Sequence, residues 1–590
     1  MSFPSISLKF IQNNTTAQSF ERGDKYCRSG SVEQITQREN ILRALVNGSE
    51  PGAYQVTIPF DAAGITSARC SCPYSFEGWC KHVVATLLVC NHQPELIEIR
   101  PSLDELLDRL DLNQTRKIIC KLLADRPELV ETLDSEINSL VTIAPTRSSK
   151  PKKARHTSTD SKIYRRQISD ILQGALRDWE EGYEDDSIVA DIGKMVEKAA
   201  AFSLVGDGES AILILEGITQ GCIDSWDEID QYSGYSEPVV ELLDQAWTEA
   251  ILTTDLDAEL ETELRSKLQH WQQEWDEEFP VCIAALSQGW SYPPLVQVLK
   301  GERTEFGAWE TTAPPFASRL ALIRLEILHR QKRSQEYLYL AKAEGKFLQY
   351  WVMLVNVGRM EEAVDSAKAQ MTRADDAYAL AKLLRTEGAI EQALEIAHLG
   401  LKFPIARHSD FTQWTSDLAE GLNKPQFVLD ARVAGFHAGP SFADYLKIQE
   451  LAGNDWPLLR QELFKTLDQV SSDHFHMQAL VDIFLHEGLL DRAIGMVKKL
   501  TAYYSELIQQ VMDGVLLHSP DWVIETSRSY AEDIIDRKRS DIYDQAIQWL
   551  KRTKAAYEAN DQRTEWREYH QNLIQVHSRK WKLIDLLKRL

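Results

Sequence analysis

The stretch CSCPYSFEGWCKH, residues 70–82, places four metal-binding side chains within thirteen residues. Cys70 and Cys72 lie two residues apart near the end of an expected strand, so both thiolates face the same side. The apolar run that follows predicts a helix with Cys80 and His82 at its start. Three thiolates and one imidazole fill a tetrahedron, which is typical of a structural zinc site and not of a catalytic one. Four unrelated residues are the alternative, which the clustering of three of the eight cysteines disfavours.

The spacing Cys-x-Cys, seven residues, Cys-x-His resembles that of the SWIM zinc finger, including the proline after the second cysteine and the Cys-Lys-His triplet. The resemblance continues upstream at positions before two expected strands: Phe20, Gly23, Tyr26, Gly30 and Val32. It implies a bound zinc ion and a binding role. SWIM fingers are associated with DNA or protein, and they accompany transposases, Swi/Snf-type ATPases and signalling kinases.

The chain is expected to be mostly α-helical behind a small β-strand/helix module. Alternating apolar residues over 54–60 predict a half-buried strand, and residues 65–72 predict another that carries the first two ligands. Beyond residue 163 the apolar periodicity is helical throughout. The predicted domains are a SWIM-type module (1–100), a helical segment (101–143), a basic flexible linker (144–162) and an acidic α-solenoid (163–590).

A degenerate repeat predicts that the solenoid consists of irregular, tetratricopeptide-like helix pairs. Gly358, Gly388 and Gly488 each stand where one helix must stop, because glycine accepts a positive φ at little cost. An alanine five residues later is expected at a close helix contact: Ala363, Ala393 and Ala493. Irregular spacing argues against a regular array.

Other residues of the helical region permit two interpretations each. Trp271 and Trp275 could stack on a ligand, but their helical spacing favours the core. The basic segment 577–590 is expected to cap the solenoid, with a membrane-surface helix as the alternative. Cys90 and His92 could be spare ligands, but we expect structural roles.

Candidate contact residues flank the ligands and occupy the linker. Arg69, Trp79 and Lys81 adjoin the ligands. Trp79 either packs over the small core, which we favour, or stacks on a base or a partner side chain. Lys81 is expected to face solvent and to contact phosphate or an acidic partner. The linker could contact phosphates without reading sequence, or be a plain soluble spacer; its candidates are Lys150, Lys152, Lys153 and Arg155.

The charge is unevenly distributed. The net charge of −24 argues against coating nucleic acid with the whole surface. Residues 1–166 carry 22 basic and 19 acidic side chains, a net charge of +3, so the remaining residues carry −27. Nucleic acid is therefore expected to approach the N-terminal part only, whereas the acidic part suits a basic protein. No long apolar run or secretory signal is visible, and the few cysteines suit a reducing compartment, so the expected location is the cytoplasm.

The motifs of common enzymes are missing from the sequence. There is no phosphate-binding GxxxxGK[ST] loop and no Gly-x-Ser-x-Gly elbow. The loose dinucleotide pattern at residues 206–211 lies between two expected helices and is interpreted as a turn. An acidic cluster that includes Asp185 and Asp186 leaves a hydrolase or nuclease as a minor alternative.

The sequence thus predicts a non-enzymatic zinc-binding adaptor. Its finger is expected to bind nucleic acid, with DNA favoured over RNA, or a protein. The helical region is expected to bind a protein partner. No membrane and no small-molecule substrate are expected. The alternative is a protein–protein assembly module that binds no nucleic acid.

Overall fold

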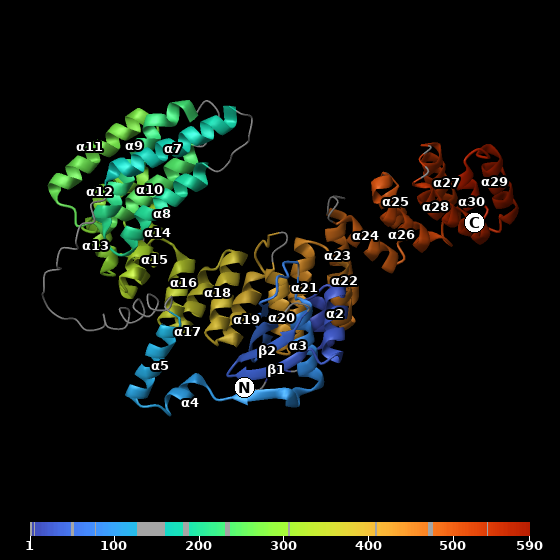
Figure 1. Cartoon of the computed structure of the whole chain (residues 1–590), viewed down its shortest axis with the longest axis horizontal. Coiled ribbons are helices and arrows are strands. Elements are labelled where there is room, and N and C mark those ends of the chain that lie inside the picture. Colours follow the sequence, from blue (N-terminus) through green and yellow to red (C-terminus); the bar gives the residue numbers. More distant parts are fainter. Residues whose placement is uncertain are drawn as a thin grey trace. The chain divides into compact units, whose positions relative to one another are not determined.

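The structure is a computed structural model that describes residues 3–4, 6–48, 52–76, 78–126, 160–180, 188–229, 236–304, 307–406, 410–469, 476–498, 500–537, 539 and 541–590. The chain divides into two compact units. Residues 1–98, 372–381 and 393–590 form the first unit, and residues 99–371 and 382–392 form the second. The fold is mostly α-helical, with a small sheet-and-helix module at the N-terminus, as the sequence predicts (Figure 1).

The N-terminal module is built on an antiparallel sheet in the order β4-β3-β2-β1-β6, with β5 paired to β3. Its strands are β1 (Val32–Arg38), β2 (Ile41–Asn47), β3 (Ala53–Asp61), β4 (Gly64–Ile65), β5 (Arg69–Cys70) and β6 (Ile97–Arg100). The strand expected over residues 65–72 is instead two short strands. Between them the ladder is interrupted, and the chain pairs with β3 again where Arg69 and Cys70 lie opposite Thr57 and Val56.

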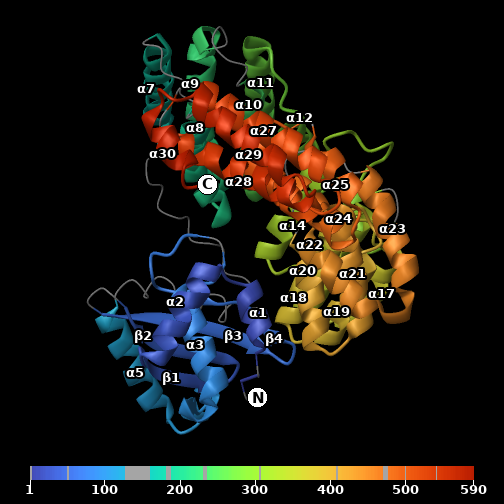
Figure 2. The same cartoon turned by 90° about the vertical axis from the view of Figure 1, so that its right-hand side faces the viewer.

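Buried and more exposed side chains alternate along the central strands, so one face of the sheet is buried. Val56, Ile58 and Phe60 of β3 are buried, and they are two residues apart because successive side chains of a strand point to opposite faces. Helix α3 (Lys81–His92) packs on the sheet, and α2 (Ala17–Arg28) packs on α3 (Figure 2). Helix α1 (Leu8–Asn13) completes the layer. The ligand-bearing segment thus lies at an edge of a small core.

Within the second unit, most helices between residues 161 and 330 pack around one apolar cluster. They lie together in Figure 1. Trp271 and Trp275 are buried in this cluster, so the prediction that they belong to the core is confirmed. The described helices that lie wholly within the second unit are α4 (Leu103–Leu107), α5 (Leu112–Asp125), α7 (Ser161–Glu180), α8 (Ile188–Leu204), α9 (Gly208–Ile229), α10 (Ser236–Thr253), α11 (Ala258–Trp275), α12 (Pro280–Gln288), α13 (Pro293–Leu299), α14 (Ala317–Arg330), α15 (Ser334–Ala343), α16 (Phe347–Asn356) and α17 (Met360–Gln370). Most of the predicted linker, like the Asp185 and Asp186 cluster, lies outside the described residues.

The chain changes unit after residues 371, 381 and 392, the second time within helix α18 (Ala374–Thr386) and the third just inside the next helix. The helices that follow belong to the first unit: α19 (Ile390–Gly400), α20 (Phe411–Gly421), α21 (Pro425–Ala438), α22 (Phe442–Ala452), α23 (Trp456–Gln469), α24 (Met477–His486), α25 (Leu490–Val497), α26 (Ser505–Val515), α27 (Pro520–Asp536), α28 (Tyr543–Ala559), α29 (Arg563–Val576) and α30 (Trp581–Leu587). Three 3₁₀ turns interrupt the chain: η1 (Pro94–Leu96), η2 (Gly453–Asp455) and η3 (Ala502–Tyr504). Leu583 and Leu587 of α30 are fully buried against the preceding helices, in agreement with the predicted cap.

The predicted glycine turns end helices as expected. Gly358, Gly388 and Gly488 have φ values of 80°, 82° and 70°. After each of them, the next backbone N–H donates to the carbonyl five residues earlier, as in a Schellman motif. The three alanines that follow the glycines by five residues are fully buried. The pattern at Gly206 is also a helix–helix turn of this type, between α8 and α9, and not a dinucleotide-binding loop.

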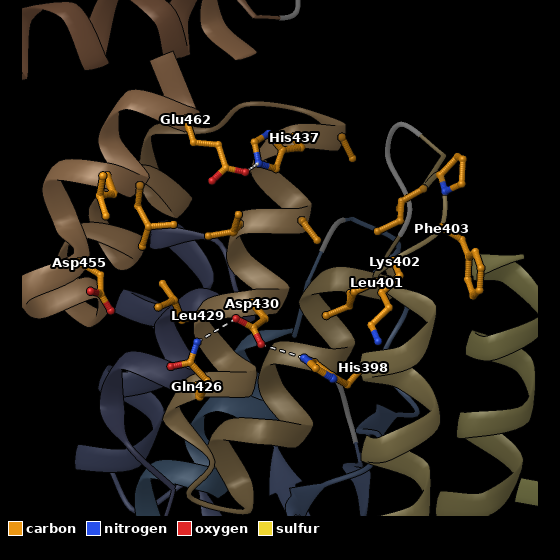
Figure 3. Close-up of a pocket in the computed structure, with 17 residues that line it drawn as sticks. His398, Leu401, Lys402, Phe403, Gln426, Leu429, Asp430, His437, Asp455 and Glu462 are labelled. Carbon is orange, nitrogen blue, oxygen red and sulfur yellow. Dashed lines mark hydrogen bonds and ion pairs between the residues drawn. The ribbon is translucent and has the colours of Figure 1, made fainter. Parts of the chain in front are cut away.

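An open groove of about 930 Å³ runs along α21 within the first unit (Figure 3). It is lined by residues of α19, α21, η2, α23 and the segment after α19. Among the described residues, no helix is both long and apolar enough to cross a lipid bilayer.

Candidate metal centre

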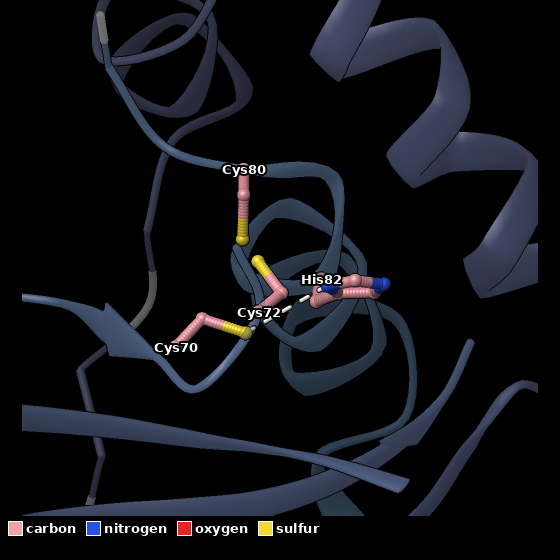
Figure 4. A group of neighbouring side chains, drawn as sticks. All are labelled: Cys70, Cys72, Cys80 and His82. Carbon is pink, nitrogen blue, oxygen red and sulfur yellow. Dashed lines mark hydrogen bonds between the residues drawn. The ribbon is translucent and has the colours of Figure 1, made fainter. Parts of the chain in front are cut away.

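The four predicted ligands come from two short pieces of chain that meet at the edge of the small core. Cys70 ends β5, Cys72 follows in a bend, Cys80 is the N-cap residue of α3, and His82 lies in the first turn of that helix. Their donor atoms all lie within 4.8 Å of one another. The side chains converge on one point, with His82 Nδ1 3.7 Å from Cys70 Sγ (Figure 4).

This donor set fits a zinc ion. A tetrahedral site with zinc–sulfur bonds of about 2.3 Å has edges of about 3.8 Å between donors, close to the 3.7 Å between Cys70 Sγ and His82 Nδ1. All four donors come from the protein, so no position is left for water or substrate. Cys70, Cys72, Cys80 and His82 would therefore hold a structural ion that ties the bend after β5 to the start of α3. Among the described residues, this is the single cluster of metal-binding side chains.

Backbone N–H groups lie near the three sulfur atoms. The N–H groups of Cys72, Tyr74 and Val83 lower the pKa of the Cys70, Cys72 and Cys80 thiols respectively, so each favours the thiolate. Two of the donors lie two residues beyond their sulfur atom, and the third lies at the N-terminus of α3. The backbone is thus arranged to support the charged form that a metal ion requires.

The thiols also influence one another. The hydrogen bond with Cys80, followed by burial, raises the pKa of Cys70 far above the ordinary range. Burial raises the pKa of Cys72. The hydrogen bond from Cys70 lowers the pKa of Cys80. Zinc binds thiolates, so thiol protons must leave when the ion binds.

Two tyrosines hold the His82 ring in place. The ring stacks on Tyr54 with a centroid distance of 4.5 Å, and Tyr26 contacts it edge-on at 5.5 Å. The Thr86 hydroxyl donates to the His82 carbonyl. His82 Nδ1 faces the thiols, whereas Nε2 points away from them and is buried without a hydrogen-bond partner among the described residues (Figure 4). The ring is therefore fixed by packing, with one nitrogen committed to the metal site.

Close packing of α2 against α3 positions the second ligand pair. A Cβ atom on Gly23 would lie 2.6 Å from the Cβ of Val84 and 3.1 Å from the carbonyl oxygen of Lys81. Those two residues flank His82 and its neighbour Val83 in the sequence. Only glycine allows the two helices to approach so closely here.

The predicted contact residues next to the ligands differ in exposure. Arg69 is exposed. Trp79 is half-buried and packs edge-on against Phe10, which agrees with the packing interpretation and not with a free stacking platform. Lys81 is half-buried, and its ammonium donates to the Tyr26 hydroxyl at 2.9 Å, so the side chain is less free than expected. Its contact with phosphate or an acidic partner stays a prediction. The side chain turns back because the Tyr26 hydroxyl lies within its reach on α2.

The other predicted contacts and spare ligands are separate from the cluster. Lys150, Lys152, Lys153 and Arg155 lie outside the described residues. Cys90 is in the core, where burial raises its pKa to about 12. His92 is the last residue of α3, and its Nδ1 lies 4.0 Å from Cys27 Sγ. Neither Cys90 nor His92 joins the four-residue cluster.

Two further candidate contact residues are not predicted from the sequence. Phe76, between the ligand pairs, is 77% exposed and contacts Tyr74 edge-on. An aromatic residue within the ligand loop is a signal that could have identified it. Arg22 of α2 is exposed and lines a small pocket of about 250 Å³ beside the ligands. Nothing in the sequence places Arg22 there, because it lies 48 residues before the first ligand (70 − 22).

The site and its sheet-and-helix support define a structural zinc-finger module. Residues 54–91 match the family model of the SWIM zinc finger. The chain therefore carries a SWIM zinc finger, and zinc is its cofactor.

Relatives with the same type of finger are much longer proteins. The chain is 33% identical over 135 residues to a zinc finger SWIM domain-containing protein 8 homolog of Drosophila melanogaster, which is 22% of this chain and 6% of the fly protein. It is 32% identical over 121 residues to zinc finger SWIM domain-containing protein 8 of Bos taurus and of Homo sapiens. Those matches cover 20% of this chain and 8% and 6% of the relatives. The similarity thus spans a small part of each relative.

Proposed function

We propose that this protein is a non-enzymatic adaptor whose zinc finger binds nucleic acid, with DNA favoured, while its helical region binds a protein partner. The closed donor set carries the proposal. A metal ion held by four protein side chains has no open position for a substrate, so its role is to shape a surface. Three exposed residues lie near the ligands: Arg22 lines the pocket beside them, Arg69 precedes Cys70 directly, and Phe76 lies in the segment between the two ligand pairs.

These three residues are chemically suited to a nucleic acid. Two guanidinium groups can contact phosphates, and an exposed aromatic ring can stack on an unpaired base. The basic segment around Lys150, Lys152, Lys153 and Arg155 would add contacts that are independent of sequence. Lys81 would contribute less, because its ammonium is already engaged by Tyr26.

A matched pair of variants tests the proposal. Fluorescence anisotropy would measure the binding of labelled duplex DNA, single-stranded DNA and RNA to the zinc-loaded chain at low salt. Arg69→Glu should weaken binding to the preferred nucleic acid by about tenfold, because it removes one phosphate contact and adds a like charge. Arg567→Glu is the control, since Arg567 is also exposed, on α29, and the change in net charge is the same.

The second test concerns the ring. Phe76→Ala should weaken binding to single strands more than binding to a duplex, because only unpaired bases can stack on it. Trp581→Ala, which removes an equally exposed aromatic residue on α30, should have no effect. Equal effects of the Arg69 and Arg567 variants, or no binding to any of the three nucleic acids, would refute the nucleic-acid role.

The second candidate is an assembly module that binds protein only. The acidic net charge and the exposed Phe76 favour it, because aromatic residues are enriched at the centre of protein interfaces. In that case the Phe76 variant would lose protein partners in affinity capture from nuclease-treated extract, and the three nucleic-acid probes would not bind.

A further inference from the structure

The groove along α21 has the features of a peptide-binding site. It is open, has a volume of about 930 Å³ and lies entirely within residues 398–462 (Figure 3). That volume is near the upper end for small-molecule pockets, which usually enclose their ligand. An open groove of this size suits an elongated ligand better than a compact one.

One face of α21 lines the groove along most of the helix. The lining positions from Gln426 to Ala438 recur at intervals of three and one residues, which is the spacing of a single helical face. Twelve residues of helix span about 18 Å at a rise of about 1.5 Å per residue. This face therefore offers a strip about three turns long that is partly open, with His398 of α19 and Glu462 of α23 reaching onto it at Asp430 and His437.

The floor of the groove is apolar. Val433 and Ala434 supply its centre from α21, and Leu401 and Leu459 line its sides. Leu458 of α23 lines the groove and is 72% exposed. When a partner covers an exposed leucine with apolar side chains, the complex is stabilised because apolar surface leaves water. Leu458 is therefore a candidate anchor for a partner.

Carboxylates surround this floor. Asp430, Asp455 and Glu462 line the groove, and Lys402 is the lone ammonium among its lining residues. Two of the three carboxylates are held by neighbouring imidazoles on opposite sides of the groove (Figure 3). His398 Nε2 lies 2.8 Å from Asp430, and His437 Nε2 lies 3.2 Å from Glu462. Asp455 is exposed.

We propose that this groove binds a basic amphipathic helix of a partner protein. This inference rests on the proposed role of the helical region as a protein-binding scaffold and specifies its partner. Apolar side chains of the ligand, at helical spacing, cover Leu458 and the floor, and its flanking lysines or arginines meet Asp430, Asp455 and Glu462. The chain's own segment 144–162 is basic too, but it almost lacks large apolar residues and cannot cover the floor.

The first test compares two labelled peptides of about fourteen residues, long enough for about four helical turns. Both consist of leucine, alanine and lysine, with the leucines on one face in the first peptide and scattered around the helix in the second. The intact zinc-loaded chain should bind the first about tenfold more tightly at an ionic strength of about 0.15 M. Equal affinities would overturn the proposal, because charge alone would then explain the binding.

Matched variants test whether the amphipathic peptide binds in the groove. Leu458→Asp should weaken binding of the amphipathic peptide by about tenfold or more. Leu517→Asp should change it less than about twofold, because Leu517 is 86% exposed but lies outside the groove. Asp455→Lys should weaken binding, whereas Glu525→Lys, an exposed site on α27, should not. Equal effects within either pair would refute a site in the groove.

A third peptide, residues 144–162 of this chain, distinguishes a partner from self-association. If it displaces the amphipathic probe at similar concentrations, the groove recognises charge alone and the proposal is wrong. Nucleic-acid binding by the finger is measured in the same preparations. Failure of the groove tests with finger binding intact refutes this inference alone, and loss of finger binding with groove binding intact refutes the proposed role of the finger.

Discussion

The zinc finger and the two helical cores are stabilised by different means. Each helical core is a continuous apolar cluster formed by many helices. In the finger, the described residues between β5 and α3 form neither helix nor strand. Backbone bonds hold this segment at its ends, from Ser71 to Gln55 and from Trp79 to Asn14. The Ser19 hydroxyl also donates to the Tyr74 hydroxyl, at 3.2 Å. We infer that a metal ion supplies most of the remaining restraint, so the finger should depend on zinc and the helical cores should not.

The largest effect should come from loss of a ligand. Cys72→Ser should abolish zinc retention, because structural zinc contributes about 10–16 kcal/mol in small fingers, and the segment around it should lose hydrogen-exchange protection. The helical cores should keep theirs. Cys120→Ser, an exposed cysteine on α5, is the control. Zinc content measured by mass spectrometry checks the prediction, and a zinc-loaded Cys72 variant would contradict it.

The second effect belongs to the helical core of the second unit. Asp244 of α10 is buried, and its carboxylate accepts the N–H groups of Val281 and Cys282 in the first turn of α12. Asp244→Ala leaves both donors unsatisfied and should cost about 3 kcal/mol. Urea unfolding measures this loss, and zinc content should be unchanged. A loss within error of zero would show that water replaces the carboxylate.

A smaller effect is expected where α2 meets α3. Gly23→Ala should destabilise the finger by about 2 kcal/mol, because its Cβ atom collides with Val84. Gly174→Ala is the matched control, since that glycine also lies within a helix but has open space around it. The control should be neutral or slightly stabilising. Zinc-release kinetics measure the first effect, and equal behaviour of both variants would contradict it.

Turn glycines should have a still smaller effect. Gly488→Ala forces a side chain into a left-handed conformation, at a cost of about 1 kcal/mol. Gly495→Ala, inside α25 with open space around it, should stabilise by about 0.5–1 kcal/mol. Thermal unfolding should therefore shift in opposite directions for the two variants. The same sign for both would contradict the role of the turn.

The smallest effect concerns pH. Burial raises the pKa of Asp244, so the folded state keeps this proton to a higher pH than the unfolded chain does. Its ionisation therefore costs stability at neutral pH, and the cost falls as the pH drops through the folded pKa. On acidification from pH 7 to 5, the wild type should gain stability relative to Asp244→Asn by less than about 1 kcal/mol. A loss relative to that variant would contradict the sign.

The sequence predicts well what depends on neighbours in the chain. The spacing of Cys70, Cys72, Cys80 and His82, and the helix that starts beside them, are local features. The glycine turns are local as well. The same turn also occurs at residues with weaker signals, Lys332, Asn423 and Asp561, whose φ values are 57°, 58° and 55°. Asparagine and aspartate tolerate this conformation, so glycine alone undercounts the repeats.

Contacts between residues that are distant in the chain cannot be predicted from the periodicity of the sequence. Asp244 caps a helix that begins 36 residues later in the chain (280 − 244), and nothing in its local sequence shows this. The ammonium of Lys81 turns back to Tyr26, which lies on another helix. The groove along α21 forms because two segments that are distant in the sequence, residues 398–405 and 455–462, lie on either side of one helical face. Such features depend on tertiary packing, which periodicity does not encode.

The most direct test of the central claim is hydrogen exchange of the intact chain before and after removal of zinc by a chelator. The purified chain should contain about one zinc ion at the outset. Peptides within residues 54–91 should lose protection on chelation and regain it when zinc is restored, while peptides within the helical cores stay protected. A chain purified without zinc, or protection of residues 54–91 that survives chelation, would contradict the claim that the ion holds the finger together.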